Sequence, residues 1–492
     1  MTVTPIAVTS FLAVLIAALH WCIMIGLGLR IVLKRRPTGV SIAWLLIVVS
    51  VPFVGAALYL FVGELWLPRG RIKAYKSYIE SIESQIDLVD SSWDVKGEDL
   101  SPMARKLNAQ SANPLRVSAI GGNSFELIDS PGVCMRMIAK DIDQAKQSVS
   151  MLFYIWESNG DTAIVENALI RAAQRGVCCR LMIDGAGSAK FIKSRRIGEL
   201  RAKGIEVLPL LGVGVLRVLF ARIDIRNHRK IVTIDHKVGF TGSMNMVDPQ
   251  FFHVKKNVGQ WVDVMARVCG PAARVLDFTV RSDWAIETKQ FENGFSLFEY
   301  EGVDPIESAG SSVLQVVPSG PDQAPQIIHD MLLTLIYNST QRLILTTPYF
   351  IPSEAMLTGL TAAARRGVAV TLVLPEKLDS YLVRHASKSY YEDLLESGVE
   401  IFHYKGGLLH TKTVTVDDEV ALIGTVNMDK RSFWINFEIS LFAYEQSDVK
   451  RVRELQESYI DHASSIELSD WQSRPLHSRI VQGVVQLFGP VL

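Results

Sequence analysis

The sequence predicts an α/β protein of two tandem halves, in which helices cover mixed sheets about a pseudo-two-fold axis, preceded by a two-helix transmembrane hairpin. Three observations support this prediction. A motif of fixed spacing occurs twice, each copy follows an alternation of apolar strands and Ala-rich helices, and two long apolar segments lie near the N-terminus. Alternating strands and helices are typical of α/β folds whose sheets are covered by helices.

The order of these features divides the chain of 492 residues into five parts. They are a transmembrane hairpin over residues 1–66, a polar and partly helical connector over 67–115, a first half over 116–300, a second half over 301–470 and an amphipathic C-terminal tail over 471–492. The tail is apolar with a basic start, and two interpretations stay open. It lies in the membrane interface, or it docks against the catalytic part.

The hairpin is predicted from residues 11–29, which are apolar except for His20, and from residues 42–62, which carry no charge. Each segment is long enough to span a bilayer. A signal peptide is disfavoured for the first segment, because it lacks a charged leading region and a cleavage site of small residues. The link between the segments and the stretch after the second one each carry four basic residues, so the positive-inside rule gives no orientation.

Composition narrows the function classes. Lys+Arg and Asp+Glu both number 51, and a net charge of zero argues against a nucleic-acid partner. A hydrophobic content of 48% favours a membrane protein with a large soluble part. The five cysteines form no C-x-x-C pair, so neither a disulfide framework nor a metal site is expected.

Each half repeats one order of elements. An apolar strand over residues 148–156, or 342–351, precedes an Ala-rich helix that closes with Arg-Gly-Val, and a second strand follows. Gly176 and Gly367 stand where a helix commonly ends in the left-handed conformation. The order predicts a tandem duplication with a longer insert in the first half.

The repeated motif reads H-x-K-x4-D-x6-G-[S/T]-x-N. The first copy supplies His228, Lys230, Asp235, Ser243 and Asn245, and the second supplies His410, Lys412, Asp417, Thr425 and Asn427. A neutral imidazole can attack phosphorus and an imidazolium can donate a proton, so two histidines can divide the cleavage of a phosphodiester. The β-branched residues after each Lys predict strands, on which positions i and i+2 share a face.

Asp235 and Asp417 belong to the catalytic motif, yet each ends its strand at a turn. We therefore favour a turn-stabilising role over direct chemistry for both carboxylates. Another acid should then orient each imidazole through its second nitrogen. Asp263 and Glu438 are the best downstream candidates. Tyr154 and Tyr349 lie near the ends of equivalent strands, where they either border the site or pack in the core, and we favour the core.

The doubled motif resembles the HKD signature of the phospholipase D superfamily. A hairpin followed by two HKD halves is similar to the layout of bacterial cardiolipin synthases of that superfamily. Four strings are also similar to that family, at residues 62–65, 153–156, 241–249 and 406–412. The resemblance covers essentially the whole chain.

The resemblance implies roles for the motif residues. It assigns Asp263 to His228 and Glu438 to His410 as supporting carboxylates. Lys230 would clamp the phosphoryl oxygens together with Lys412. By analogy with two-motif relatives, His228 is the nucleophile and His410 the acid and base. The phosphate would be lined by the remaining polar motif residues, Ser243, Asn245, Thr425 and Asn427.

The reaction that the resemblance implies converts two phosphatidylglycerol molecules to cardiolipin and glycerol through a phosphohistidine intermediate, with no cofactor and no metal. The partners would be phosphatidylglycerol and other anionic phospholipids, and the location a bacterial inner membrane with a multi-pass anchor. The alternative is a phospholipase D-type hydrolase that releases phosphatidic acid. A nucleic-acid phosphodiesterase is disfavoured by the neutral charge, and a non-enzymatic scaffold by two intact motifs.

Overall fold

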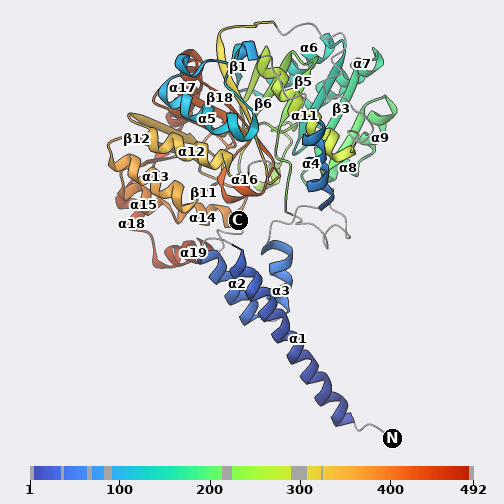
Figure 1. The fold of residues 1–492 in the computed structure, drawn as a ribbon. Coiled ribbons are helices and arrows are strands. Elements are labelled where there is room, and N and C mark those ends of the chain that lie inside the picture. Colours follow the sequence, from blue (N-terminus) through green and yellow to red (C-terminus); the bar gives the residue numbers. More distant parts are fainter. Residues whose placement is uncertain are drawn as a thin grey trace. The chain divides into compact units, whose positions relative to one another are not determined.

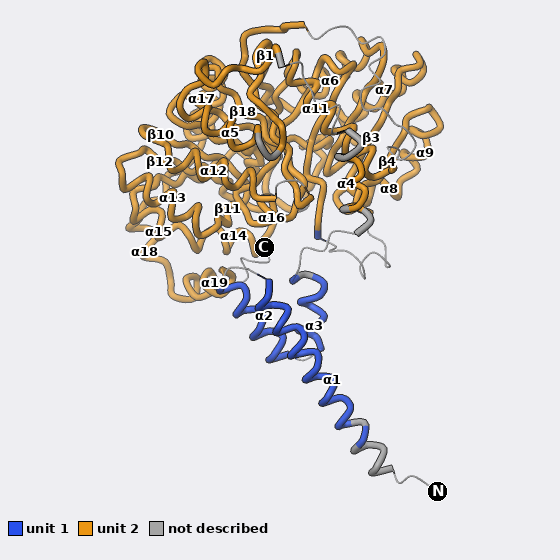
Figure 2. The backbone as a smooth tube through the Cα atoms, viewed as in Figure 1, with its two compact units in different colours: residues 1–68, 213–224 blue, residues 69–212, 225–492 orange. Residues whose placement is uncertain are grey.

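The computed structural model describes residues 5–34, 38–51, 53–63, 69–82, 91–212, 224–289, 307–322 and 325–486 (Figure 1). The chain separates into two compact units, residues 1–68 with 213–224 and residues 69–212 with 225–492 (Figure 2). The predicted boundary between the two halves, at residues 300 and 301, lies outside the described residues.

The first unit is helical in its described part. It contains α1 (Pro5–Leu33), α2 (Thr38–Ser50), α3 (Val54–Leu58) and a π-helical turn, Tyr59–Gly63. Within the described ranges, one stretch is long and apolar enough to cross a membrane, Ala13–Leu33 in α1, with a mean hydropathy of 2.0. Large apolar side chains of α1 such as Val14 and Ile25 are exposed, as expected for a surface that contacts lipid.

The sequence prediction treated the second apolar segment as one helix, whereas the structure divides it into two helices. Helix α2 ends at Ser50, and α3 begins at Val54 after Phe53, whose φ is +61°. The sequence has a proline at position 52, and proline has no backbone N–H and disfavours helix in the residue before it. A Cβ on Gly55 would lie 2.3 Å from the carbonyl oxygen of Ile47, so the close approach of α3 to α2 requires glycine there.

The second unit contains a sheet of fifteen strands among the described residues. The first half contributes β1 (Ile120–Ile128), β2 (Ser148–Phe153), β3 (Cys178–Asp184), β4 (Glu206–Leu210), β5 (Ile231–Ile234), β6 (Val238–Gly242) and β8 (Met265–Cys269) to this sheet. The short strand β7 (Trp261–Val262) also belongs to the first half but lies outside the sheet. The second-half strands, with the short β11, β14 and β17, are β9 (Ser312–Ser319), β10 (Arg342–Thr346), β11 (Phe350–Ile351), β12 (Ala369–Pro375), β13 (Glu400–Tyr404), β14 (Leu408–Leu409), β15 (Thr413–Val416), β16 (Val420–Gly424), β17 (Met428–Asp429), β18 (Glu438–Ala443) and β19 (Ala463–Ser465).

The two halves repeat one strand order. The first half runs β4-β3-β2-β5-β6-β8-β1 and the second runs β13-β12-β10-β15-β16-β18-β9, with β19 added at the far edge. The outer strands of each half pair in parallel, as β2 does with β3, and the motif strands pair antiparallel, as β5 does with β6. Strand β1 pairs antiparallel with β9, so the two mixed sheets form one continuous sheet.

Helices cover both faces of the sheet (Figure 1). The helices before and within the first half are α4 (Arg69–Ile82), α5 (Pro102–Leu115), α6 (Pro131–Gln144), α7 (Thr162–Gln174), α8 (Ala189–Ile192), α9 (Arg195–Ala202) and α11 (Pro271–Thr288). Those of the second half are α12 (Ile327–Asn338), α13 (Glu354–Arg365), α14 (Tyr381–Lys388), α15 (Tyr391–Glu396), α16 (Lys430–Trp434), α17 (Gln446–Asp461), α18 (Leu468–Gln472) and α19 (Leu476–Gln486).

Side-chain alternation along each motif strand determines which helices it contacts. In β5, Val232 and Ile234 pack in the core cluster of α6 and α7, while Thr233 donates a hydrogen bond to Asp277 of α11 at 2.8 Å. In β15, Thr415 likewise donates to Gln456 of α17. Alternate residues of a strand point to opposite faces, so both motif strands are buried on both sides.

The predicted connector contributes two helices to the second unit. In α4, Arg71 forms ion pairs with Glu287 at 2.7 Å and Asp322 at 3.3 Å, and the Tyr78 hydroxyl hydrogen-bonds Ser282 at 2.6 Å. In α5, Gln110 donates a hydrogen bond to Thr334 at 2.8 Å. Through these contacts the described part of the connector packs against the rest of the second unit.

Candidate active site

The two motif histidines precede the equivalent strands β5 and β15 by three residues, where each half contacts the other. The backbone N–H of His228 donates to the carbonyl of Phe437, and that of His410 donates to the carbonyl of Val262, both at 2.8 Å. Strand β14, directly before His410, pairs in parallel with β7 of the first half. Each motif histidine is therefore fixed by backbone from the opposite half.

The supporting carboxylates are exchanged between the halves. Nδ1 of His228 lies 2.9 Å from Oε2 of Glu438, and Nδ1 of His410 lies 2.6 Å from Oδ1 of Asp263. The predicted pairing of each histidine with the carboxylate of its own half was wrong. The reason is the chain pairing across the halves, since Asp263 follows β7, which lies beside the residues that precede His410.

Ser243 and Thr425 hold these carboxylates. Ser243 Oγ donates to Asp263 Oδ1 at 2.6 Å, and Thr425 Oγ1 donates to Glu438 Oε2 at 2.5 Å. Each hydroxyl also accepts a backbone N–H at 3.0 Å. Neither residue is part of the cavity lining, and both hydroxyls bind the acids, so a direct contact with phosphate stays a prediction. The change from Ser to Thr keeps the bond to the acid.

The side chains of both motif lysines are fully buried. Lys230 Nζ donates to the carbonyl of His228 at 2.7 Å, and Lys412 Nζ donates to the carbonyl of His410. Burial lowers the pKa of Lys230 to about 8 and that of Lys412 to about 7. Two ammonium groups in a site of low dielectric constant interact strongly with any phosphoryl oxygen that enters it.

Both imidazoles line one cavity of about 360 Å³. Asn245 Nδ2 and Asn427 Oδ1, from equivalent motif positions, are buried without a hydrogen-bond partner among the described residues, which suits ligand binding. The full lining consists of Tyr154, Ile155, Arg226, His228, Asn245, His253, Lys256, Trp261, Tyr349, Ile351, Asp379, Ser380, Val383, His410, Asn427, Asp429, Arg431 and Asn436.

Aromatic rings flank both imidazoles. The Tyr154 ring lies 5.0 Å from the His228 ring, and the Trp261 ring lies 4.2 Å from the His410 ring. Tyr349 also lines the cavity, where its hydroxyl donates to Asp379 at 2.8 Å. The interpretation of Tyr154 and Tyr349 as core residues was wrong, because their strands end at the cavity and leave both rings facing it.

Burial favours the neutral form of both motif histidines. Burial lowers the pKa of His228 and lowers that of His410 to about 4, although the neighbouring carboxylates oppose the shift. A neutral imidazole held through Nδ1 presents its other nitrogen as a nucleophile or a base. A phosphodiester between the rings adds negative charge, which favours protonation of the second imidazole.

Asp235 and Asp417 lie away from this cavity. Asp235 accepts the backbone N–H groups of residues 146, 147 and 148, and Asp417 accepts those of residues 340, 341 and 342. Both adopt the left-handed conformation, with φ of +48° and +50°. Seven residues of extended chain, roughly 23 Å, separate each from its histidine. These contacts agree with the turn-stabilising interpretation, and they place neither carboxylate at the cavity, although both belong to the catalytic motif.

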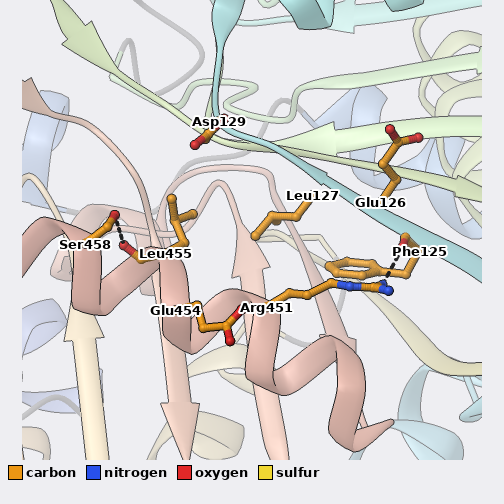
Figure 3. A pocket seen from close by; sticks show the side chains of 8 residues that line it. All are labelled: Phe125, Glu126, Leu127, Asp129, Arg451, Glu454, Leu455 and Ser458. Carbon is orange, nitrogen blue, oxygen red and sulfur yellow. Dashed lines mark hydrogen bonds between the residues drawn. The ribbon is translucent and has the colours of Figure 1, made fainter.

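A larger cavity of about 510 Å³ contains none of the motif residues. It lies beside β1 and α17, where Arg451 donates a hydrogen bond to the carbonyl of Phe125 at 3.1 Å (Figure 3). Size therefore does not identify the reactive site, whereas the paired imidazoles do. In the described part of the chain, no group of three or more His, Cys, Asp or Glu side chains is placed to hold a metal ion, and the absence of a metal requirement stays a prediction.

Comparison with known proteins places this geometry in a family. Residues 138–261 and 332–460 match the family described as cardiolipin synthase, PLD-like domain, and residues 13–64 match the family described as Phospholipase_D-nuclease N-terminal. Cardiolipin synthase A of Wigglesworthia glossinidia brevipalpis is 38% identical over 491 residues, which cover 98% of this chain and 99% of that protein.

The chain belongs to the cardiolipin synthase family. A second member, cardiolipin synthase A of Cronobacter sakazakii, is 39% identical over 96% of this chain and 97% of its own length. The crystal structure of phosphatidylserine synthase from Haemophilus influenzae superposes with a TM-score of 0.57 over 79% of this chain and 100% of that chain, at 14% identity. That likeness supports the fold of the two tandem phospholipase D-like halves.

Proposed function

We propose that this family member is a membrane-bound phosphatidyltransferase that converts two phosphatidylglycerol molecules to cardiolipin and glycerol. The observation that carries the proposal is one cavity lined by two imidazoles, each held through Nδ1 by a buried carboxylate. Two halves related by a pseudo-two-fold axis would bring both imidazoles to one phosphorus. The relatives named cardiolipin synthase A support the choice of substrate.

The first half-reaction forms a phosphatidyl-enzyme. Nε2 of one neutral imidazole attacks phosphorus, the bond from phosphorus to the glycerol oxygen breaks, and the second imidazolium donates its proton to that oxygen. Lys230 and Lys412 stabilise the charge on the phosphoryl oxygens. Asn245 would donate to the same oxygens through its Nδ2, and Asn427 would line the phosphate beside it. The assignment of His228 as the nucleophile stays a prediction.

The second half-reaction transfers the phosphatidyl group. The second imidazole, now neutral, takes the proton of a glycerol hydroxyl on another phosphatidylglycerol. The hydroxyl oxygen attacks phosphorus, and the bond between phosphorus and the histidine nitrogen breaks. Cardiolipin leaves, and both imidazoles return to their starting states.

A product assay tests the proposal. Purified full-length protein in detergent is incubated with phosphatidylglycerol and a chelator, and the lipids are resolved by mass spectrometry. Cardiolipin with an equal amount of glycerol is the expected result. Phosphatidic acid as the main product would mean that water is the acceptor and that the chain is a hydrolase.

The buried lysines predict the alkaline limit of activity. The protonated form is the useful one, and it is lost as pH rises through the pKa of about 7 for Lys412 and about 8 for Lys230. Because kcat/KM reports ionisation of the free enzyme, we expect loss of the two lysine protons to lower kcat/KM for phosphatidylglycerol about tenfold between pH 7 and pH 8 and about a hundredfold per pH unit above pH 8. A profile that stays flat to pH 9.5, with the protein still folded, would contradict this.

We further propose that an apolar rim beside the cavity contacts the membrane surface. The rim consists of Tyr381 and Leu382 on α14 with Leu476, Ile480 and Val484 on α19, which are all exposed. The opposite side of α19 buries Gln482 and Val485, and α19 packs against α14. Ser380 and Val383, adjacent to the exposed pair on α14, line the cavity. The described part of the C-terminal tail thus docks against the second half, as one of its two interpretations predicted, and its exposed apolar side would contact the membrane; residues 487–492 lie outside the described residues.

The rim is tested with Val484→Glu. A carboxylate there opposes contact with apolar and anionic lipid, so the interfacial KM for phosphatidylglycerol in mixed micelles should rise about tenfold. Val133→Glu on α6, another exposed valine, is the matched control and should leave KM unchanged. An equal effect in both variants would contradict the rim.

Membrane insertion completes the proposal. Helix α1 would cross the bilayer, and the apolar segment of α2 and α3 would enter it beside α1, so that the enzyme stays in the plane that holds both substrates. The multi-pass topology in a bacterial inner membrane stays a prediction. Confinement to that plane raises the effective concentration of both lipids.

A further inference from the structure

The acceptor in the proposed reaction carries a charge that the motif lysines do not neutralise. The second phosphatidylglycerol has its own phosphodiester, a few atoms from the hydroxyl that attacks. Both lysines already lie beneath the reacting phosphoryl group, each bound to the carbonyl of its own motif histidine. Two phosphodiesters brought this close repel each other in a site of low dielectric constant, so a further cation is required. This inference rests on the proposed function.

Two arginines outside the motif line the same cavity, Arg226 and Arg431. Arg226 precedes His228 by two residues, and its carbonyl accepts the backbone N–H of Phe437 at 2.9 Å. Arg431 lies in the first turn of α16, which Asp429 caps by accepting the backbone N–H of Ser432 at 2.7 Å. A contact between the halves thus fixes the backbone of Arg226 at the cavity wall, and a contact within the second half fixes that of Arg431.

Both arginines share the cavity lining with Tyr154 and His228. Burial raises the pKa of Tyr154, whose ring lies 5.0 Å from that of His228, and the charges of both arginines oppose this rise. Asp184, a nearby carboxylate of the first half, interacts with the charge of Arg226 and also accepts backbone N–H groups. Its Oδ1 accepts the N–H groups of residues 186 and 187, and its Oδ2 accepts that of Asn227.

Neither arginine is part of the repeated motif, and neither has an arginine at the equivalent position of the other half. The position equivalent to Arg226, two residues before His410, is Leu408. The position equivalent to Arg431, four residues after the motif Asn, is Pro249. At the other end of the cavity, Lys256 is paired with Asp379 at 3.2 Å. The two arginines are therefore an asymmetric feature of this cavity, although cleavage at a symmetric pair of motifs requires no such asymmetry.

We propose that Arg226 and Arg431 bind the phosphodiester of the acceptor lipid. Arginine presents a fork of donors that matches two phosphate oxygens at once. An alcohol attached to a phosphodiester is held beside the phosphatidyl-enzyme, and a neutral alcohol or water is not. The two arginines therefore select an anionic lipid as the acceptor.

Competition between two acceptors tests this site. Full-length enzyme is given phosphatidylglycerol together with isotope-labelled glycerol, so that transfer to lipid yields cardiolipin and transfer to glycerol yields labelled phosphatidylglycerol. In Arg226→Gln and Arg431→Gln we expect the ratio of cardiolipin to labelled phosphatidylglycerol to fall roughly 10- to 100-fold. Lys at either position should restore part of the ratio. Arg136→Gln, an exposed arginine on α6 paired with Asp161, is the matched control.

The possible results separate this inference from the proposed function. An unchanged ratio in both Gln variants overturns the acceptor site, and so does a parallel loss of both products, which would place the arginines at the donor phosphate or in the fold. Failure of the unmodified enzyme to form either product overturns the proposed function and this inference with it. A lowered ratio with glycerol transfer retained supports the acceptor site.

Discussion

Replacing His228 or His410 by alanine is expected to lower cardiolipin formation by roughly 10⁴-fold or more, because each imidazole performs a step that the other cannot perform at the same time. Both rings line one cavity and both are fixed through Nδ1, so neither is a spare copy. The measurement is the product assay with phosphatidylglycerol, extended to long incubations so that residual turnover is quantified.

The control for this loss is His462→Ala. His462 is exposed and hydrogen-bonds the carbonyl of Ser458 at 2.8 Å, so its removal should leave the rate unchanged. Thermal unfolding of each variant separates lost chemistry from lost fold. Activity within tenfold of the unmodified enzyme in either active-site variant would rule out a mechanism with two histidines.

Exchange of the carboxylates between the halves gives the second large effect. Glu438→Gln should lower turnover by roughly 10³- to 10⁴-fold, since an amide no longer fixes the useful tautomer of His228 or stabilises its protonated form. Asp263→Asn should do the same through His410. In each case the histidine that loses its carboxylate lies in the half that does not contain the substitution.

Chemical modification shows which imidazole each acid serves. Reaction with diethyl pyrocarbonate, followed peptide by peptide with mass spectrometry, should change at His228 in Glu438→Gln and at His410 in Asp263→Asn. Asp277→Asn is the matched control, because Asp277 holds His236 at 2.6 Å in a buried pair outside the cavity. Altered reactivity at the histidine of the same half would contradict the exchange.

The sequence correctly predicted that each motif histidine and lysine share one site, because their relative geometry is local. A β-branched run fixes the strand, and a strand fixes which residues share a face, so Lys230 follows His228 to one site. The turn-stabilising role of Asp235 was predictable for the same reason. Tyr154 was assigned to the core because an aromatic residue near a strand end fits a core as well as a cavity.

The carboxylate pairing was not predictable because it depends on contacts between the halves. Asp263 reaches His410 only because β7 lies beside β14, two segments about 150 residues apart. The break in the second apolar segment left a weaker signal, a proline at position 52 and Gly55, which apolar content alone conceals. Arg226 and Arg431 lie outside the motif, and nothing in their local sequence marks them as site residues.

The exchanged carboxylates also constrain how such a protein could arise. A single-motif ancestor would have had a histidine and an acid that could not meet within one copy. Its active site would have existed only in a homodimer, with each protomer orienting the imidazole of the other. Gene fusion would then have joined subunits that already depended on each other, and it would have freed equivalent positions such as Arg226 and Leu408 to diverge. One chain could thereby acquire separate places for donor and acceptor, which two identical subunits cannot provide.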